Sequence, residues 1–281
     1  MIEAKNVSVI IENKTIVDRV SMKLVRNKFS VILGKNGAGK STFLKALTGD
    51  VKRASGEIMV EERPLESIEP IYLARKRAVM MQNLSLTFGF TAEQVVMMGR
   101  SPHVGGFESK RDRQIVRECM KQAGVDHLSD RIFPTLSGGE QQRVQIARMI
   151  AQLWERMEER RPCALLLDEP LSSLDLSHQH SIMRLIKDLC KKGVAVLMIL
   201  HDLNLAAQYA DEVHIMKNGR TYALGTPNDV FKSEIIEMAF DCPVQIIQHP
   251  LHSCPLVIAL GGQLSGTASQ SSTRTPVRSL G

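Results

Sequence analysis

The sequence predicts an α/β fold with a parallel β-sheet, and three observations lead to this prediction. The apolar run "FSVIL" (29–33) indicates a strand that enters the glycine-rich loop "GKNGAGKST" (34–42). The run "CALLLDEP" (163–170) is short, continuously apolar and ends in two carboxylates, which is typical of a strand covered on both faces. A helix-forming stretch (177–193) then leads to the apolar run "VAVLMIL" (194–200), so a strand–helix–strand unit is expected.

The first third of the chain predicts strands on either side of one helix. After the loop, "STFLKALTG" (41–49) indicates a helix that ends at Gly49, because glycine suits the left-handed position past a helix end. The expected strands here are "VSVII" (7–11), "VSMKLV" (20–25), "SGEIMVEERPL" (55–65) and a buried strand in "LARKRAVMMQ" (73–82) that ends near Gln82.

The region from about residue 86 to 160 is predicted to be helical. Thr91 is the expected N-cap of one helix, and Gln94 lies three residues later in the capping-box position. Two longer helical runs follow, at 109–125 and 140–161.

Two features are expected in the last third. "VHIMKNGRTYALG" (213–225) predicts a β-hairpin, with Asn218 and Gly219 supplying the positive φ angles of a type I′ turn. Residues 263–281 are rich in Ser, Gly and Thr, and we expect a disordered tail because they bury too little apolar surface.

The composition is that of an ordinary globular protein. Among 281 residues, 43% are hydrophobic and 23% charged, and no apolar run approaches the roughly 20 residues of a membrane span. The N-terminus lacks the basic start and apolar block of a signal peptide, so we expect a cytoplasmic chain.

The formal net charge of +6 does not favour nucleic-acid binding. The basic residues are dispersed and often stand beside acids, as in "RMEERRP" (156–162), and only 4% of residues are aromatic. A membrane-associated partner fits the same charge equally well.

The cysteines indicate reduced thiols, because they are five in number and show no CxxC spacing. Cys242, His249, His252 and Cys254 can be interpreted as a zinc cluster, but their spacing matches no common zinc module and prolines interrupt it. We therefore do not expect a zinc site.

The loop at 34–42 carries a complete Walker A pattern, Gly34-x-x-x-x-Gly39-Lys40-Ser41, between an expected strand and an expected helix. Its glycines allow backbone N–H groups to surround phosphate oxygens. Lys40 is expected to span the β and γ phosphates, and Ser41 to ligate Mg²⁺.

Polar side chains end the strands that should lie beside this loop. Asp168 and Glu169 follow one buried strand, His201 follows the next, and Gln82 follows the apolar stretch at 73–81. The carboxyl ends of parallel strands meet at one edge of the sheet, where a carboxylate can hold the metal shell and another can activate water.

A second helix start that favours anions is expected in "TLSGGEQQ" (135–142), where small residues lead into a helical run.

These motifs occur together in a known family. Their order and approximate spacing resemble those of ATP-binding cassette (ABC) proteins over about residues 1–260. The motifs are "GKNGAGKST" (34–42), Gln82, "LSGGEQ" (136–141), "LLLDEP" (165–170), "SSLD" (172–175) and His201.

The resemblance implies a P-loop NTPase fold. It would have a RecA-like core with a parallel sheet, an N-terminal antiparallel β subdomain and an inserted helical signature subdomain at about 86–160. The ABC ATPase domain would span residues 1–262 and be followed by the tail at 263–281.

The resemblance also implies ATP and Mg²⁺ as ligands and gives each motif a role. Glu169 would be the general base and His201 the γ-phosphate switch. The phosphate-binding residues would be Gly34, Asn36, Gly37, Ala38, Gly39, Lys40, Ser41 and Thr42, and the metal ligands Ser41, Gln82 and Asp168.

The signature residues imply a homodimer. In this family Ser137, Gly138 and Gly139 would bind the ATP of the opposite subunit, and Asp175 would contact the partner across the same interface. Each site would then be half-built in one chain and completed when ATP joins two chains.

The sequence departs from the family pattern at a few positions. The adenine-stacking aromatic residue would fall near Ile11, where the chain has no aromatic, so base recognition is expected to rest on apolar contact. Lys35 stands where proline or serine is usual, and Leu171 replaces a frequent threonine.

Within the family, the chain resembles hemin-import ATPases. The resemblance lies in four passages: 62–82, 87–103, 145–154 with the variable insertion before "LLLDEP", and "HPLHSCPLVIAL" (249–260). ATPases for ferric siderophores and cobalamin share much of this pattern and remain alternatives.

The resemblance implies partners at a membrane. Two transmembrane permease subunits would bind the ATPase dimer at the cytoplasmic face of the bacterial inner membrane, with contacts expected at 83–100. A periplasmic substrate-binding protein would act indirectly, and no nucleic acid is expected.

Two other classes are less favoured by the sequence. A non-transport ABC ATPase of the DNA-repair type would need a long coiled-coil insertion, and the gap from Ser41 to Leu136 is too short for one. A nucleotide-binding module without turnover would be expected to lack the base at Glu169.

Overall fold

A six-stranded mixed sheet forms the centre of the molecule. The computed structural model describes residues 1–81, 89–172 and 174–261. The sheet runs in the order β10-β9-β3-β8-β7-β6, and β10 alone pairs antiparallel with its neighbour. Its strands are β3 (Phe29–Leu33), β6 (Arg77–Met80), β7 (Cys163–Asp168), β8 (Val194–Ile199), β9 (Glu212–Lys217) and β10 (Arg220–Gly225).

Three of the four inner strands, β3, β7 and β8, are buried along their whole length. Layers of helices and strands cover both faces of the sheet, which excludes water from the apolar side chains on each face. The prediction of parallel strands from continuous apolar runs is confirmed.

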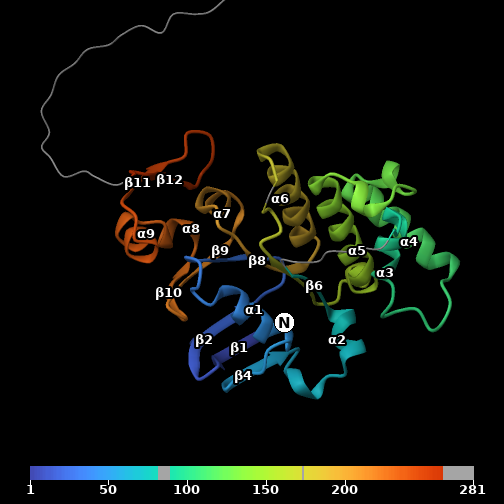
Figure 1. The fold of residues 1–281 in the computed structure, drawn as a ribbon, viewed down its shortest axis with the longest axis horizontal. Coiled ribbons are helices and arrows are strands. Elements are labelled where there is room, and N and C mark those ends of the chain that lie inside the picture. Colours follow the sequence, from blue (N-terminus) through green and yellow to red (C-terminus); the bar gives the residue numbers. More distant parts are fainter. Residues whose placement is uncertain (82–88, 173, 262–281) are drawn as a thin grey trace, which may run out of the picture.

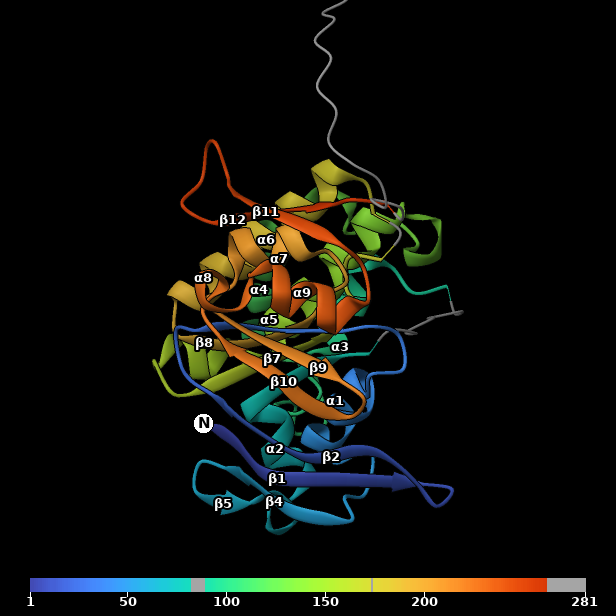
Figure 2. The same ribbon diagram turned by 90° about the vertical axis from the view of Figure 1, so that its left-hand side faces the viewer.

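A second sheet, antiparallel throughout, lies beside the first. It runs in the order β2-β1-β4-β5. Its strands are β1 (Ile2–Ile11), β2 (Lys14–Leu24), β4 (Ser55–Val60) and β5 (Arg63–Pro64). Helix α1 (Lys40–Thr48) lies between the two sheets (Figure 2), and its residues Phe43, Leu44 and Leu47 pack in one cluster with apolar residues of both.

Three helices gather at one end of the central sheet (Figure 1). They are α3 (Ala92–Met98), α4 (Lys110–Ala123) and α5 (Gly138–Glu158). Inside this group the guanidinium of Arg100 contacts Asp112 of α4 and both Ala151 O and Glu155 of α5. The group corresponds to the helical region predicted at 86–160.

The remaining elements surround this frame. Helices α6 (Leu176–Lys191) and α7 (Leu203–Tyr209) cover the face of the central sheet opposite α1 (Figure 2). The hairpin of β11 (Val244–Gln248) and β12 (Pro255–Ala259) packs on α7, where Asn204 bonds both backbone groups of Val257. The other elements are α2 (Pro70–Lys76), α8 (Pro227–Val230), α9 (Ser233–Phe240) and the 3₁₀ turns η1 (Leu65–Ser67), η2 (Asp126–Leu128) and η3 (Phe133–Thr135).

Local signals in the sequence are reproduced in detail. Thr91 caps α3 in a capping box with Gln94, and Gly49 ends α1 at φ 76°. Asn218 and Gly219 both have positive φ in the β9–β10 hairpin. The expected strand at 73–82 is shorter than predicted, because its first part is the end of α2.

The Cys and His residues near the C-terminus lie in and beside the β11–β12 hairpin. His249 Nδ1 accepts hydrogen bonds from the N–H groups of Leu251 and His252, and His252 Nε2 lies 3.0 Å from the Gln208 amide. Over the described ranges, no group of three or more His, Cys, Asp or Glu side chains is arranged to hold a metal.

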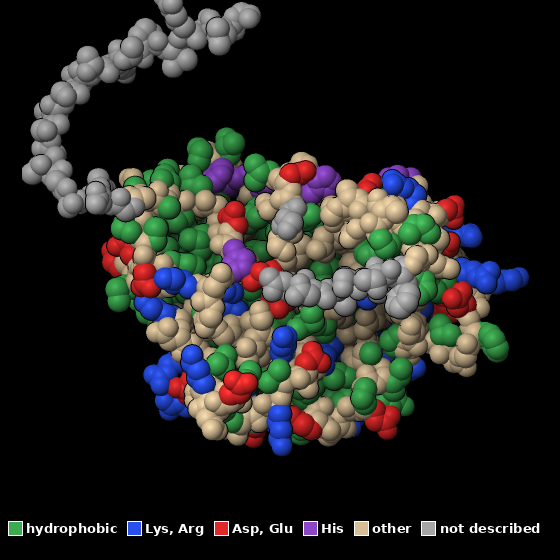
Figure 3. Space-filling model, in the orientation of Figure 1, with side chains coloured by type: hydrophobic (Ala, Val, Ile, Leu, Met, Phe, Trp, Pro, Cys, Tyr) green, Lys and Arg blue, Asp and Glu red, His purple; other side chains and the backbone are tan. Residues whose placement is uncertain are grey.

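Charges of both signs are interspersed on the face shown in Figure 3, with Lys and Arg next to Asp and Glu. No helix within residues 1–81, 89–172 and 174–261 has the length and apolarity that a bilayer crossing requires. The expected tail at 263–281 lies outside the described residues.

Candidate active site

The glycine-rich loop joins the end of β3 to the start of α1. Gly34 has φ 149°, and a Cβ there would lie 2.3 Å from Met216 O, so only glycine fits. Gly39 has φ 93° and a Cβ would lie 2.6 Å from Ile16 O. The chain can therefore make this loop only because both positions lack a side chain.

Lys40 points its ammonium group into the loop. Nζ donates to Gly34 O at 2.8 Å and to Lys35 O at 3.1 Å, and the residue is only 5% exposed. Burial lowers the pKa of Lys40, and the nearby carboxylates of Glu169 and Asp168 act in the opposite direction. An anion bound in the loop would offset the cost of burying this charge.

The other loop residues differ in their exposure. Asn36 and Gly37 are exposed, and Gly37 has φ 80°. Ala38 is buried and donates its N–H to Lys35 O at 3.1 Å. Thr42 lies half-buried in the first turn of α1.

Ser41 contacts the carboxylate that ends β7. Its Oγ donates to Asp168 Oδ1 at 3.1 Å. Asp168 is 2% exposed, and burial raises the pKa of its carboxyl, whereas the Ser41 hydrogen bond lowers it. A buried carboxylate beside a hydroxyl is an oxygen donor set that fits Mg²⁺, because a divalent cation would compensate the buried negative charge.

Glu169 and His201 lie together at the same edge of the sheet. Strands β7 and β8 are parallel neighbours with Asp168 opposite Ile199, so the residues that follow them emerge side by side. His201 Nε2 is 2.5 Å from Glu169 Oε1. Glu169 has φ 49°, an uncommon angle for a residue with a side chain and one often found at functional sites.

Gln82, expected at this edge as a metal ligand, lies outside the described residues. The structure thus brings Lys40, Ser41, Asp168, Glu169 and His201 to one place, as the order of the motifs indicated.

The signature motif begins helix α5 but is capped by its own residues. Ser137 is the N-cap, its Oγ accepts from Glu140 N at 3.4 Å, and Glu140 Oε2 accepts from Ser137 N at 2.8 Å. The expectation of a helix start is confirmed, but one of the first-turn N–H groups, that of Glu140, already has a partner within the chain.

The signature motif packs against the segment after β7. A Cβ on Gly138 would lie 3.7 Å from Leu174, and one on Gly139 would lie 2.4 Å from the ring of His178. His178 in turn contacts Asp175, the N-cap of α6. Sequence reasoning missed His178, although its spacing three residues after an N-cap aspartate is a signal that could have found it.

Ile11, near which an adenine-stacking aromatic residue was expected, is the last residue of β1 and is 42% exposed, so its apolar side chain faces solvent.

Comparison with known proteins agrees with the motifs. The ABC transporter family matches residues 17–172. A hemin import ATP-binding protein of Gloeobacter violaceus is 44% identical over 93% of this chain and 94% of its own length. Proteins of the same name from Pseudomonas aeruginosa and Deinococcus radiodurans are each 42% identical over 92% of this chain, and 100% and 97% of their own lengths are covered.

Solved structures share the fold. A transporter described as of the metal-chelate type, in an inward-facing conformation, has a TM-score of 0.77 at 26% identity and covers 92% of this chain and 96% of its own. A dimeric bacterial ABC transporter cassette has a TM-score of 0.69 at 26% identity and covers 80% of this chain and 98% of its own. The predicted P-loop fold, with its antiparallel subdomain and helical insertion, is confirmed.

Proposed function

This chain belongs to the ABC transporter family, and on that premise we propose that it is the ATP-hydrolysing subunit of a bacterial importer whose cargo is hemin. The observation that carries the proposal is the identity of 38–44% to hemin import ATP-binding proteins over at least 92% of this chain. The ATPase subunit would be attached to the permease at the cytoplasmic face of the inner membrane.

Nucleotide binding starts from the position of Lys40. Its ammonium is held inside the loop by two carbonyl oxygens and needs little movement to meet phosphate oxygens. The loop residues from Gly34 to Thr42 would surround the phosphates with backbone N–H groups.

Mg²⁺ would be held by Ser41, Asp168 and Gln82, and when bound it would neutralise charge that develops on the phosphates. The Ser41 hydroxyl and the Asp168 carboxylate are already within hydrogen-bond distance, so they offer two adjacent oxygens. Movement of the Ser41 proton away from Asp168 would free both oxygens for the ion.

Hydrolysis needs a base beside the γ-phosphate, and Glu169 fits this role. Its carboxylate can accept the proton of an attacking water. His201 Nε2, 2.5 Å from Glu169 Oε1, holds the carboxylate in place before ATP binds and would donate to the γ-phosphate once ATP is bound. The Glu169 side chain is 12% exposed and that of His201 47%, so the histidine would face the incoming nucleotide.

Two copies of the chain would complete each site. Ser137 and Gly138 are exposed at the start of α5, where they can meet the ATP of a second copy. We expect the ATPase dimer to bind two permease subunits, with a periplasmic binding protein supplying the cargo to them.

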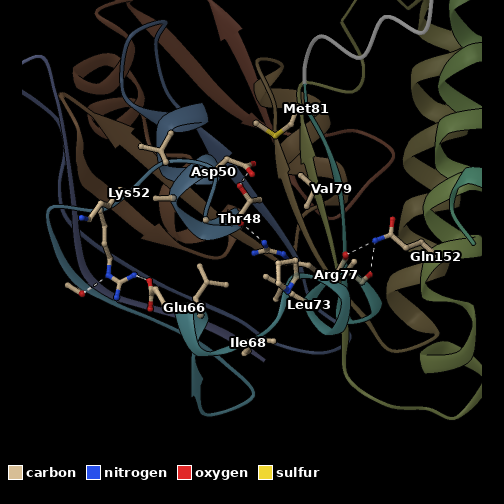
Figure 4. Close-up of a pocket in the computed structure, with 18 of the residues that line it drawn as sticks. Thr48, Asp50, Lys52, Glu66, Ile68, Leu73, Arg77, Val79, Met81 and Gln152 are labelled. Carbon is tan, nitrogen blue, oxygen red and sulfur yellow. Dashed lines mark hydrogen bonds and ion pairs between the residues drawn. The ribbon is translucent and has the colours of Figure 1, made fainter. Parts of the chain in front are cut away.

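The permease would bind at a groove of about 1130 Å³ between α2, the end of α1 and helix α5 (Figure 4). Apolar side chains of Ile68, Leu73 and Met81 line it. Arg148 of α5 also lines it, and within the described parts of the chain no hydrogen bond or ion pair is assigned to its guanidinium. A permease helix would complement this groove if its apolar face packed on these side chains and one of its carboxylates paired with Arg148.

The groove extends to Met98 and Gly99, which belong to the segment 83–100 expected to contact the permease. Residues 83–88 of that segment lie outside the described residues.

The cargo can be tested by growth. A strain lacking this gene should fail to grow with hemin as its iron source, and the Glu169→Gln variant should not restore growth. Normal growth on hemin combined with failure on a ferric siderophore would replace hemin by that second cargo class, which the similarity to a metal-chelate type transporter favours. Recovery of this chain from solubilised membranes without a permease would contradict the transport function.

A further inference from the structure

Helix α6 begins with a carboxylate that accepts several hydrogen bonds. Asp175 is its N-cap, and Oδ1 accepts from the backbone N–H of His178 at 2.9 Å and from Ser177 Oγ at 2.9 Å. Such a cap satisfies donors that the first helical turn leaves unpaired.

The imidazole of His178 returns to the same carboxylate. Nδ1 lies 2.8 Å from Asp175 Oδ1 and 2.9 Å from Oδ2. Because an ionised carboxylate can only accept, Nδ1 carries the proton and donates. Together with the backbone bond from His178, these contacts hold the pKa of Asp175 at about 2, so the carboxylate stays charged.

The opposite edge of the ring fills the space beside Gly139. A Cβ on Gly139 would lie 2.4 Å from His178 Cδ2, 2.8 Å from Cγ and 3.0 Å from Nε2. A side chain at position 139 would therefore have to displace the imidazole. One side chain thus touches both the start of α5 and the D-loop, a name that we use for residues 174–175.

The surface above this contact has the character of an interface. The Asp175 side chain is 65% exposed, and Leu176, a large apolar residue, is 72% exposed. Ser137 and Gly138 are exposed beside them. An exposed leucine next to a charged carboxylate and a helix start suits contact with a second copy of the chain.

We propose that His178 is a positioning residue that holds Asp175 against the start of α5, so that the D-loop and the signature motif meet the second copy as one rigid surface. This inference rests on the proposed function, because it needs two copies that associate on ATP. His178 does not contact ATP in this scheme and acts through Asp175 and Gly139.

The experiment compares variants in the Glu169→Gln background, which is expected to hold the ATP-bound dimer. His178→Ala removes both contacts of the ring, and His178→Asn restores a short donor toward Asp175. His180→Ala is the matched control, because this histidine is on the same helix but bonds Tyr209. Dimerisation is measured by analytical ultracentrifugation with ATP and Mg²⁺, and ATP affinity of the monomer with a fluorescent ATP analogue.

We expect His178→Ala to weaken dimerisation about tenfold, the usual scale for losing a hydrogen bond to a charged group. ATP affinity of the monomer should remain within about twofold, because the ring does not touch the nucleotide loop. His178→Asn should recover part of the loss, and His180→Ala should behave like the parent.

Three results would overturn the inference: undiminished dimerisation of His178→Ala, no recovery in His178→Asn, or an equal loss in His180→Ala. If the Glu169→Gln parent itself fails to dimerise on ATP, the proposed function fails first and the inference with it. The parent sample therefore separates the two failures.

A second measurement tests the contact without any dimer. Gly139→Ala should lower the melting temperature, because its Cβ meets the ring, and the loss should be smaller when His178 is also alanine. Strictly additive changes in the two single variants and the double variant would contradict the contact.

Discussion

Ser41 Oγ donates a hydrogen bond to Asp168 Oδ1 across 3.1 Å, although 127 positions separate the two residues in the sequence. The bond forms because α1 lies across one face of the central sheet and its first turn reaches the end of β7. The glycine loop and the acidic pair, Asp168 and Glu169, therefore form one site.

Lys40→Ala is expected to weaken ATP binding by about 30-fold or more. The ammonium would otherwise make charge-assisted hydrogen bonds to phosphate, each of which contributes about 1.5–3 kcal/mol. Binding is measured by isothermal titration calorimetry. Lys35→Ala is the control, because that side chain is half-exposed and pairs with Asp241 at 3.1 Å. Equal ATP affinity in Lys40→Ala and the parent would remove Lys40 from the phosphate site.

Glu169→Gln is expected to retain ATP binding but to slow hydrolysis by about 10²–10⁴-fold, the usual contribution of a general base. Glutamine keeps the size of the side chain and can still bond His201 but cannot take a proton from water. Phosphate release is the measurement. Glu212→Gln, whose carboxylate pairs with Lys28 at 3.3 Å at the far end of β9, should hydrolyse ATP normally. Undiminished turnover in Glu169→Gln would leave the base unassigned.

The strands and the loop that form this site could be predicted from the sequence, for a physical reason. A strand buried on both faces must be apolar along its length, as "ALLL" (164–167) is, and the residue that ends it must then emerge at the sheet edge. Local spacing was enough for Thr91 and Gly49, because a cap depends on neighbours within one turn.

Contacts between distant elements could not be predicted in this way. In the sequence, His178 and Arg100 look like polar residues that face solvent. The structure shows instead that the His178 ring lies beside Gly139 at the start of α5. It also shows that the Arg100 guanidinium lies between the carboxylates of Asp112 and Glu155. The last elements were also missed. Strand β11 has five residues, of which only Val244 is buried, and so short and exposed a segment is hard to separate from a loop in the sequence.

Arg100→Met is expected to lower the free energy of unfolding by about 3–5 kcal/mol, because it leaves the carboxylates of Asp112 and Glu155 without their buried cation. The Arg100 side chain is 2% exposed, and its bond to Asp112 is 3.0 Å long. Urea unfolding followed by circular dichroism gives the free energy.

The matched control for Arg100 is Arg111→Met. Arg111 also joins α4 and α5, through Glu158, but the two side chains are 65% and 53% exposed. An exposed pair contributes about 0–1 kcal/mol, so this change should be small. If the two variants lost similar amounts of unfolding free energy, burial would not determine how much the Arg100 contacts stabilise the fold.

His214 is expected to make stability depend on pH. The residue lies on β9 and is 1% exposed, and burial lowers the pKa of its imidazole from 6.5 to about 4. The folded state therefore keeps the ring neutral at pH values where the unfolded chain takes up a proton. The stability that this neutral ring contributes is complete above pH 6.5 and is lost as the pH falls toward 4.

The variant His214→Gln tests this dependence. The amide can still bond Thr221 Oγ1, which lies 2.7 Å from His214 Nε2, but it does not titrate. Between pH 6.5 and 4 the parent should lose up to about 3 kcal/mol more unfolding free energy than His214→Gln, since one pKa unit corresponds to about 1.4 kcal/mol. Urea unfolding at a series of pH values measures the difference, with the exposed His127→Gln as control. Parallel pH profiles for the parent and His214→Gln would mean that the ring takes up its proton as readily in the folded protein as in the unfolded chain, which would contradict the lowered pKa.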